Sequence, residues 1–261
     1  MASPVTEKAL IEVAKDRAKD IYDDAIKPAA KEAGKSLQTV LGTLNVLLSP
    51  LEELRATKYK HQHLMEEMKE RVTDIPEDKL KMLPLYISGP VTEGMRFAMD
   101  VKELREMYMG LLSSAMNEET AECVLPSFAE SIKQLSPDEA RILKALPADG
   151  RFLPMADIDI VERGKSGSIN HIKNLSMISG EAQCRCLKNA SLYIENLCRL
   201  GLCEVTRCAL PDSQYEKIFE SQEYKDAVAD IPEKFEAEAV KKCFGLTEYG
   251  ARLRMVCWGT E

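Results

Sequence analysis

The sequence lacks the features of a membrane-spanning or secreted protein. No stretch reaches the roughly 18 consecutive apolar residues that a membrane helix needs. The first eight residues, 1–8, do not combine a charged start with an apolar run, as a signal peptide does. We therefore expect a cytoplasmic protein. In that reducing compartment its eight cysteines are expected to be free thiols.

Residues for metal binding and catalysis are also scarce. Structural zinc sites usually take paired CxxC ligands, but Cys184 and Cys186 form the only closely spaced cysteine pair, and there are three histidines. No histidine is next to a serine or cysteine nucleophile, so no hydrolytic triad is proposed. Gly164–Ser166 resembles the end of a phosphate-binding loop, but Asp159 occupies the position that requires glycine. We expect no metal and no cofactor, and enzyme activity is without support.

Excess positive charge is absent as well. The net charge is −8, which argues against a broad nucleic-acid surface, because binding a phosphate backbone requires many Lys and Arg contacts. Residues 136–210 are less acidic than the rest, with ten basic and nine acidic side chains. The basic run at 163–173 is best interpreted as a solvated loop, with nucleic-acid contact as the alternative. The candidates for contact with a partner or nucleic acid are Arg163, Lys165, Lys173, Lys188 and Arg199.

The most apolar stretch extends from Ser36 to Leu51, and its sixteen residues carry no formal charge. At about 1.5 Å per residue, a helix of this length falls short of a ~30 Å hydrocarbon layer. We therefore expect a buried helix, hidden by amphipathic helices at 6–27 and 51–72. Membrane contact by the same segment is the alternative. The residues that would make this contact are Leu37, Val40, Leu41, Leu44, Val46, Leu47 and Leu48.

The firmest helix predictions lie between residues 100 and 146. Apolar residues recur there at three- and four-residue steps, the pattern of one helical face. Asp100 is expected to cap the first helix, and Ser136–Glu139 has the sequence of a capping box with proline at the first helical position. The main core is expected to contain Leu104, Tyr108, Leu111 and Leu112.

Two further helix starts are predicted before this region. Ser49–Glu52 repeats the capping signature, so a helix should begin there and continue to about Val72. Leu83–Pro90 has helix breakers at both ends and is expected to be a connector, with Pro90 opening a helix that continues through Phe97.

The C-terminal half has the outline of a winged helix. We expect a helix from Pro137, one strand at 152–160, a helix ending at Gly201, strands at 202–205 and 240–246, and a closing helix capped by Thr247. The stretch 213–229 is an acidic insert. The fold class is thus mainly α (α+β): an α-helical domain at 1–135 and a winged-helix-like α+β domain with a small antiparallel sheet at 136–261.

The helix before Gly201 would contact DNA if this domain bound it. Its predicted outward side chains mix charges, which favours protein binding over groove reading. These side chains are Lys188, Asn189, Ser191, Glu195 and Arg199.

Several blocks of residues together resemble the abortive-infection alpha (Abi-alpha) family of bacterial phage-resistance proteins. In order along the chain they are Lys27–Leu37 with Leu48–Leu51, Leu104–Tyr108 with Leu111–Met116, Pro126–Phe128 with Ile132–Ala140, Asn196–Leu202, and Leu246–Gly250. The resemblance covers nearly the whole chain. It implies a role in anti-phage defence, in which growth of an infected cell is halted, and it supplies no catalytic residue. This sequence departs from the family in the loop at 147–189.

Two functions remain open at this point. In the first, the chain is a non-enzymatic defence protein that acts through protein contacts, either with a partner or by self-association, with membrane perturbation by the segment at 36–51 as an added element. In the second, it is a winged-helix regulator that binds DNA. A salt-dependent shift in a DNA-binding assay would favour the second.

Overall fold

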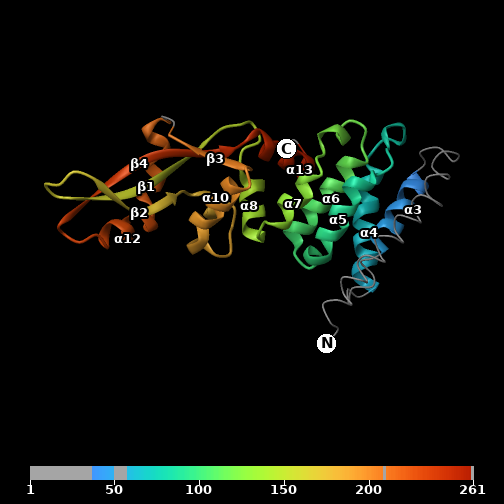
Figure 1. Ribbon diagram of the computed structural model, residues 1–261, viewed down its shortest axis with the longest axis horizontal. Helices are drawn as coiled ribbons and strands as arrows, with labels where there is room; N and C mark the ends of the chain where they lie inside the picture. The colour runs from blue at the N-terminus through green and yellow to red at the C-terminus, as the bar shows by residue number, and fades with distance from the viewer. Residues whose placement is uncertain (1–36, 50–57, 208–209, 260–261) are drawn as a thin grey trace. The chain divides into compact units, whose positions relative to one another are not determined.

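The computed structural model describes residues 37–49, 58–207 and 210–259 (Figure 1). The chain divides into two compact units, Met1–Gln134 and Leu135–Glu261. In the described part of the chain, the first unit is helical and the second combines helices with a four-stranded antiparallel sheet. The predicted α+β fold class is therefore confirmed. That each half is a separate folding domain stays a prediction.

The first unit is built around one central helix. The described helices of this unit are α3 (Leu37–Leu48), α4 (Lys58–Thr73), η3 (Glu77–Lys79), α5 (Leu85–Ala98), α6 (Lys102–Ala115), η4 (Ala121–Cys123) and α7 (Ser127–Lys133). Helix α6 contacts α4, α5 and α7. It is therefore the element on which the packing of this unit depends.

The predicted core of α6 is largely confirmed. Tyr108, Leu111 and Leu112 are fully buried, whereas Leu104 is only half-buried. The Tyr108 hydroxyl donates to the backbone oxygen of Ala129 in α7 at 3.3 Å. Helix α5 approaches the same ring so closely that a Cβ atom on Gly94 would lie 2.2 Å from Tyr108 Oη. A glycine is required at that crossing because any side chain would displace the tyrosine.

Two predicted helix starts are wrong. Val101, not Asp100, occupies the N-cap of α6, and its side chain makes no capping bond. Helix α5 begins at Leu85, so Pro90 lies inside it instead of opening it. Proline has no N–H to donate to the carbonyl four residues earlier, which belongs to Tyr86, an exposed residue in the first turn of the helix. The start predicted at Ser49–Glu52 extends outside the described residues.

Helix α3 buries one face and exposes the other. The buried side chains are Val40, Thr43, Leu44, Leu47 and Leu48. Gln38, Gly42 and Asn45 are exposed. The uncharged segment is thus amphipathic in the resting protein, with its apolar face packed near α4 and α5.

The second unit places its helices around the sheet. Its elements are α8 (Pro137–Ala145), β1 (Leu153–Glu162), β2 (Ser168–Leu175), α9 (Ile178–Glu181), η5 (Leu187–Asn189), α10 (Ala190–Arg199), β3 (Cys203–Thr206), η6 (Asp212–Gln214), α11 (Glu216–Glu220), α12 (Gln222–Ala229), β4 (Phe235–Leu246) and α13 (Glu248–Trp258). The strand order is β2-β1-β4-β3, and each pairing is antiparallel. Figure 1 shows β1, β2 and β4 running together as one long ribbon.

The strand predicted at 152–160 is present as β1, but the prediction that loop follows it is wrong, because β2 pairs with β1 as a hairpin. Ile158 pairs with Ile172 and Asp159 with Asn170, so β2 has one extra residue at this point. This bulge breaks the two-residue alternation by which a strand is recognised in a sequence. Strand β4 also begins five residues before the predicted Val240.

Buried groups fix the sheet to its surroundings. Ala156 of β1 packs with Tyr215 and Ile218, which cover one face of the sheet. Asp157 is buried, accepts from the Asn174 backbone N–H at 3.0 Å, and forms an ion pair with Lys242 of β4. Because one carboxylate joins β1, β2 and β4, the start of the ribbon is held as a unit.

The prediction that all cysteines are free thiols is wrong for one of them. Cys243 in β4 is buried and disulfide-bonded, and its partner lies outside the described residues. The apolar neighbours of Cys198, Cys243 and Cys257 in the sequence also predict burial of all three side chains. Cys243 and Cys257 are buried, and Cys257 is a free thiol, whereas Cys198 is free but only half-buried.

Candidate functional site

The most connected polar site in the second unit begins at the N-terminus of α8. Ser136 Oγ accepts from the Glu139 backbone N–H at 3.3 Å, and Glu139 Oε2 accepts from the Ser136 N–H at 2.6 Å. Pro137 occupies the first helical turn, where its missing N–H costs no bond. The predicted capping box is confirmed. It fixes the direction in which the next residue, Asp138, projects.

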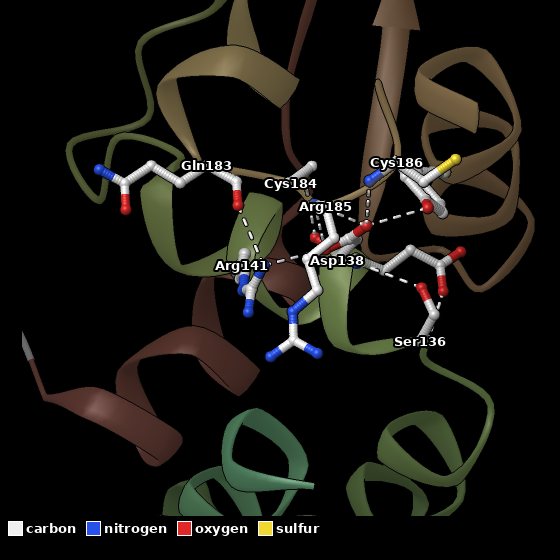
Figure 2. Close-up of polar contacts among 9 residues, drawn as sticks. Ser136, Asp138, Arg141, Gln183, Cys184, Arg185 and Cys186 are labelled. Atoms are coloured by element: carbon white, nitrogen blue, oxygen red, sulfur yellow. Dashed lines mark hydrogen bonds and ion pairs between the residues drawn. The ribbon is translucent and has the colours of Figure 1, made fainter. Parts of the chain in front are cut away.

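Asp138 binds a loop that follows α9 (Figure 2). Its carboxylate accepts from the backbone N–H of Arg185 at 2.9 and 3.0 Å and from that of Cys186 at 3.1 Å. The Tyr193 hydroxyl donates to Asp138 Oδ2 at 3.0 Å. The side chain is 6% exposed, so these bonds are made largely away from water. One carboxylate therefore joins the start of α8 to the segment that leads into α10.

The same loop is held at two further points. Arg141, one turn along α8, forms an ion pair with Asp138 at 3.2 Å and donates to the Gln183 backbone oxygen at 3.0 Å. The Cys184 thiol donates to the Asp138 backbone oxygen at 3.6 Å. Gln183 has φ 55°, a left-handed conformation that costs free energy for a non-glycine residue and that these bonds stabilise. We call the Asp138, Arg141 and 183–186 network the Asp138 clamp.

The electrostatics of the Asp138 clamp favour a structural role. Burial alone would raise the pKa of Asp138, but the N–H groups of Arg185 and Cys186, the Tyr193 hydroxyl and Arg141 outweigh it and lower the pKa below its ordinary value. Burial raises the pKa of the Cys184 thiol to about 11, and the nearby Asp138 carboxylate adds to this rise. A thiol with that pKa is protonated at neutral pH and is a poor nucleophile.

Two cavities adjoin the segment between β2 and α9, and both are lined by Ser176 and Met177. The larger, about 300 Å³, lies beside Leu153, Phe244 and Lys217. The smaller, about 220 Å³, lies between the end of β2, α9, the start of α10 and α12. We call the smaller one the β2–α10 cavity. Both present a concave surface to a small ligand.

The structure brings together two of the five predicted contact residues. Lys173 and Lys188 both line the β2–α10 cavity. Arg163 and Lys165 lie instead at the turn between β1 and β2, where they pair with Glu236 at 3.0 Å and Glu162 at 2.9 Å. The predicted solvated loop therefore comprises the exposed turn of the hairpin and the first part of strand β2. Arg199 is exposed at the end of α10.

The exposed face of α10 is short and mixed in character. Leu192, Glu195 and Arg199 are exposed at the spacing of one helical face, whereas Ile194 and Leu197 are buried on the other. Leu192 is 61% exposed, and Arg199 donates to Asn196 Oδ1 at 2.9 Å. We call these three residues the α10 face. It offers a leucine and one charge of each sign, which is not the run of cations that a phosphate backbone attracts.

The predicted membrane-active residues share the burial of α3. Val40, Leu44, Leu47 and Leu48 are buried. Leu37, Leu41 and Val46 are half-buried. Among the described residues, no helix is both long and apolar enough to cross a membrane.

Sequence reasoning missed the residues that organise the second unit. Asp138 appears in the sequence only as an acidic residue in the first turn of a helix, where it complements the helix dipole. Apart from Arg141, the partners of its carboxylate lie 47 to 55 residues away, and no local pattern connects them. The Asp157–Lys242 pair is similarly nonlocal. Across the described parts of the chain, no group of three or more His, Cys, Asp or Glu side chains is arranged to hold a metal ion.

Comparison with known proteins gives the class of the chain. The model of the family described as "Abortive infection alpha" matches residues 56–257, which cover much of the first unit and nearly all of the second. The protein therefore belongs to the abortive-infection alpha family, and this membership supports a role in abortive-infection-type defence.

Other comparisons add little. A search of the curated proteins found no significant match. One solved structure, an uncharacterized protein from the hydrocarbon-degrading marine bacterium Alcanivorax borkumensis SK2, is 18% identical with a TM-score of 0.35. The similarity covers 53% of this chain and 94% of that one.

Proposed function

We propose that this protein takes part in abortive-infection defence without catalysis, through a protein contact made by the α10 face. Family membership supports the defence role. The observation that carries the contact is the exposure of Leu192, at 61%, on a helix whose other face is packed in the core. An exposed leucine between charged neighbours matches the arrangement of a protein contact, in which an apolar centre is surrounded by a polar rim.

The Asp138 clamp supports this proposal by making the face rigid. It fixes the loop that leads into α10, and Asn196 of α10 donates to Glu139 Oε1 at 2.7 Å. Both ends of the connection between α8 and α10 are therefore tied. A surface that is already ordered loses less conformational entropy on binding than a mobile one, so a small contact area suffices.

The charge of the α10 face favours protein over DNA. Arg199 is its only cation, its guanidinium already bonds Asn196, and Glu195 would repel phosphate. The alternative, if a protein contact is ruled out, is that the second unit binds DNA as a winged helix.

The test is phage challenge of cells that carry the Leu192→Asp and Arg199→Glu double variant. We expect loss of protection, followed as cell survival together with lysis timing, at an unchanged protein level and thermal midpoint. Lys225→Glu, a charge reversal at an exposed position of α12, is the matched control and should protect as well as the parent. Full protection by the double variant would contradict the proposal.

Two assays on the purified chain separate the remaining mechanisms. A salt-dependent mobility shift of DNA that is lost in Arg199→Glu but kept in Leu192→Asp would indicate that the α10 face binds DNA. Liposome leakage caused by the parent protein and unaffected by either substitution would indicate that the protein acts on a membrane and not through the α10 face. Sedimentation of the parent and of Leu192→Asp shows whether the partner is a second copy of this chain.

A further inference from the structure

The β2–α10 cavity joins apolar walls to a basic rim. The apolar part of its lining comes from Ile172, Leu175, Met177 and Leu187. The volume of about 220 Å³ is below the range of about 300 to 1,000 Å³ typical of drug-sized ligands, so the cavity encloses a small molecule or part of a larger one that extends into solvent.

The side chains of the two lysines at this cavity are unpaired. Among the described residues, neither the Lys173 nor the Lys188 ammonium group forms an ion pair or a hydrogen bond, and both residues are exposed at the cavity. Elsewhere in the second unit, Lys165, Lys241 and Lys242 are each paired with a carboxylate. Two ammonium groups at one small cavity favour an anion, because a shared negative charge interacts with both.

A polar group in the wall also lacks a partner. The hydroxyl oxygen of Ser176 is buried and makes no hydrogen bond within the described part of the chain. The Ser179 hydroxyl is buried too, but it faces the Cys184 thiol, with which it shares a hydrogen bond. Ser176 lines the cavity. Buried polar atoms are nearly always hydrogen-bonded, so the unpaired Ser176 hydroxyl suggests that an acceptor belongs there.

The start of α10 adds partial positive charge to the same place. Ala190 and Ser191 line the cavity, and Asn189 at the N-cap makes no side-chain capping bond. The Ala190 N–H already donates to the Leu187 carbonyl oxygen, so the helix start contributes through the positive end of its dipole. Asn174, buried and held at φ 57°, donates to Ser191 Oγ at 3.4 Å and fixes the opposite wall.

We propose that the β2–α10 cavity binds a small organic phosphate, with the phosphate between Lys173, Lys188 and the start of α10. The apolar lining then contacts the body of the ligand. Glu223 at the rim would repel additional phosphate groups and accept a ligand hydroxyl, so a monophosphate is favoured over a polyphosphate. This site is separate from the α10 face, and neither lysine belongs to that face.

The test is calorimetric titration of the full chain with adenosine monophosphate, inorganic phosphate and adenosine. We expect the monophosphate to bind most tightly, inorganic phosphate more weakly, and adenosine at least about tenfold more weakly than the monophosphate. Lys173→Gln and Lys188→Gln should each weaken monophosphate binding about tenfold, and the double variant about a hundredfold. Lys225→Gln removes an exposed lysine of α12 that does not line the cavity, so it should leave the affinity unchanged.

Three results would overturn the proposal. They are no binding of the monophosphate at millimolar concentration, equal binding by the parent and the double variant, and equal binding of adenosine and its monophosphate. Both lysines are exposed, so their replacement should not prevent folding, and an unchanged thermal midpoint without ligand checks this. Phage protection by the double lysine variant is measured separately, because the proposed protein contact does not require the two lysines.

Discussion

The two units keep their folds by different means. The first buries apolar side chains of α6 against α5 and α7, with Tyr108, Leu111 and Leu112 fully enclosed. The second places carboxylates where its elements meet: Asp138 joins α8 to the loop before α10, and Asp157 joins three strands. Apolar packing is insensitive to pH, whereas a buried carboxylate contributes its bonds fully only when ionised. The difference predicts two separable responses to mutation and acid.

The sequence supplies a probe for separating them. Trp258 is the only tryptophan and lies in α13 of the second unit. Its fluorescence should therefore follow unfolding of the second unit, while far-UV circular dichroism follows helices of both. Each prediction below uses this pair of signals.

The largest expected effect is on the first unit. Leu111→Ala removes a fully buried side chain and leaves a cavity in tightly packed surroundings. We expect a loss of about 2 to 5 kcal/mol in the free energy of unfolding measured by circular dichroism in urea. Leu125→Ala, at a more exposed position, is the control and should cost less than about 1 kcal/mol. A loss below about 0.5 kcal/mol for Leu111→Ala would show that this helix does not carry the core.

The next effect should appear in the second unit. Asp138→Asn keeps the shape of the side chain but replaces a charged acceptor of four donors by an amide. We expect a loss of about 1.5 to 3 kcal/mol, the range for hydrogen bonds to charged groups, in unfolding followed by Trp258 fluorescence. Asp212→Asn interrupts an exposed pair with Lys241 and should cost at most about 1 kcal/mol. Equal losses in the free energy of unfolding would mean that the buried bonds of Asp138 stabilise the second unit no more than the exposed Asp212–Lys241 pair does.

Acid should distinguish the units without any mutation. The folded-state pKa of Asp138 is lower than its unfolded value, because its N–H, hydroxyl and guanidinium partners outweigh burial. The stabilisation is therefore complete above the ordinary pKa of aspartate and disappears as pH falls through the lowered one. We expect the urea midpoint reported by Trp258 to fall over this pH range, with a shallower fall in Asp138→Asn. The same slope in both proteins would assign the acid response to other groups.

Local features of the fold were predictable and nonlocal ones were not. Ser136 and Glu139 are three residues apart, so their capping box is encoded in a short pattern. The burial of Tyr108 and Leu111 followed from helical periodicity in the same way. Asp138, by contrast, finds its partners 47 to 55 residues later, and only the folded chain brings them together.

The missed strand has a more specific cause. Ile169 and Ile172 of β2 are three residues apart but pair with Ile160 and Ile158, which are two apart, because of the intervening bulge. A spacing of three does not match the two-residue alternation of a strand, and Gly164 and Gly167, which precede β2, are typical of a loop. The candidate cavity was missed for a related reason: Lys173 and Lys188 are fifteen residues apart in the sequence and meet only because β2 ends beside the start of α10.

The smallest expected effect tests whether α3 is only a packing element of the first unit. Gln38 lies on the exposed face of α3, so Gln38→Lys should change the free energy of unfolding by no more than about 0.5 kcal/mol. Val46→Asp, at a half-buried position on the same helix, places a charge against apolar neighbours and should cost more.

If α3 acts only by packing, the Gln38→Lys variant protects cells from phage as well as the parent, and the parent causes no liposome leakage. If α3 instead enters a membrane interface, a lysine near its start could keep its charge in the headgroup region, so the decisive result is leakage by the parent protein that this stable variant alters. Such a result would show that the apolar face of α3 has a use beyond the core of the first unit.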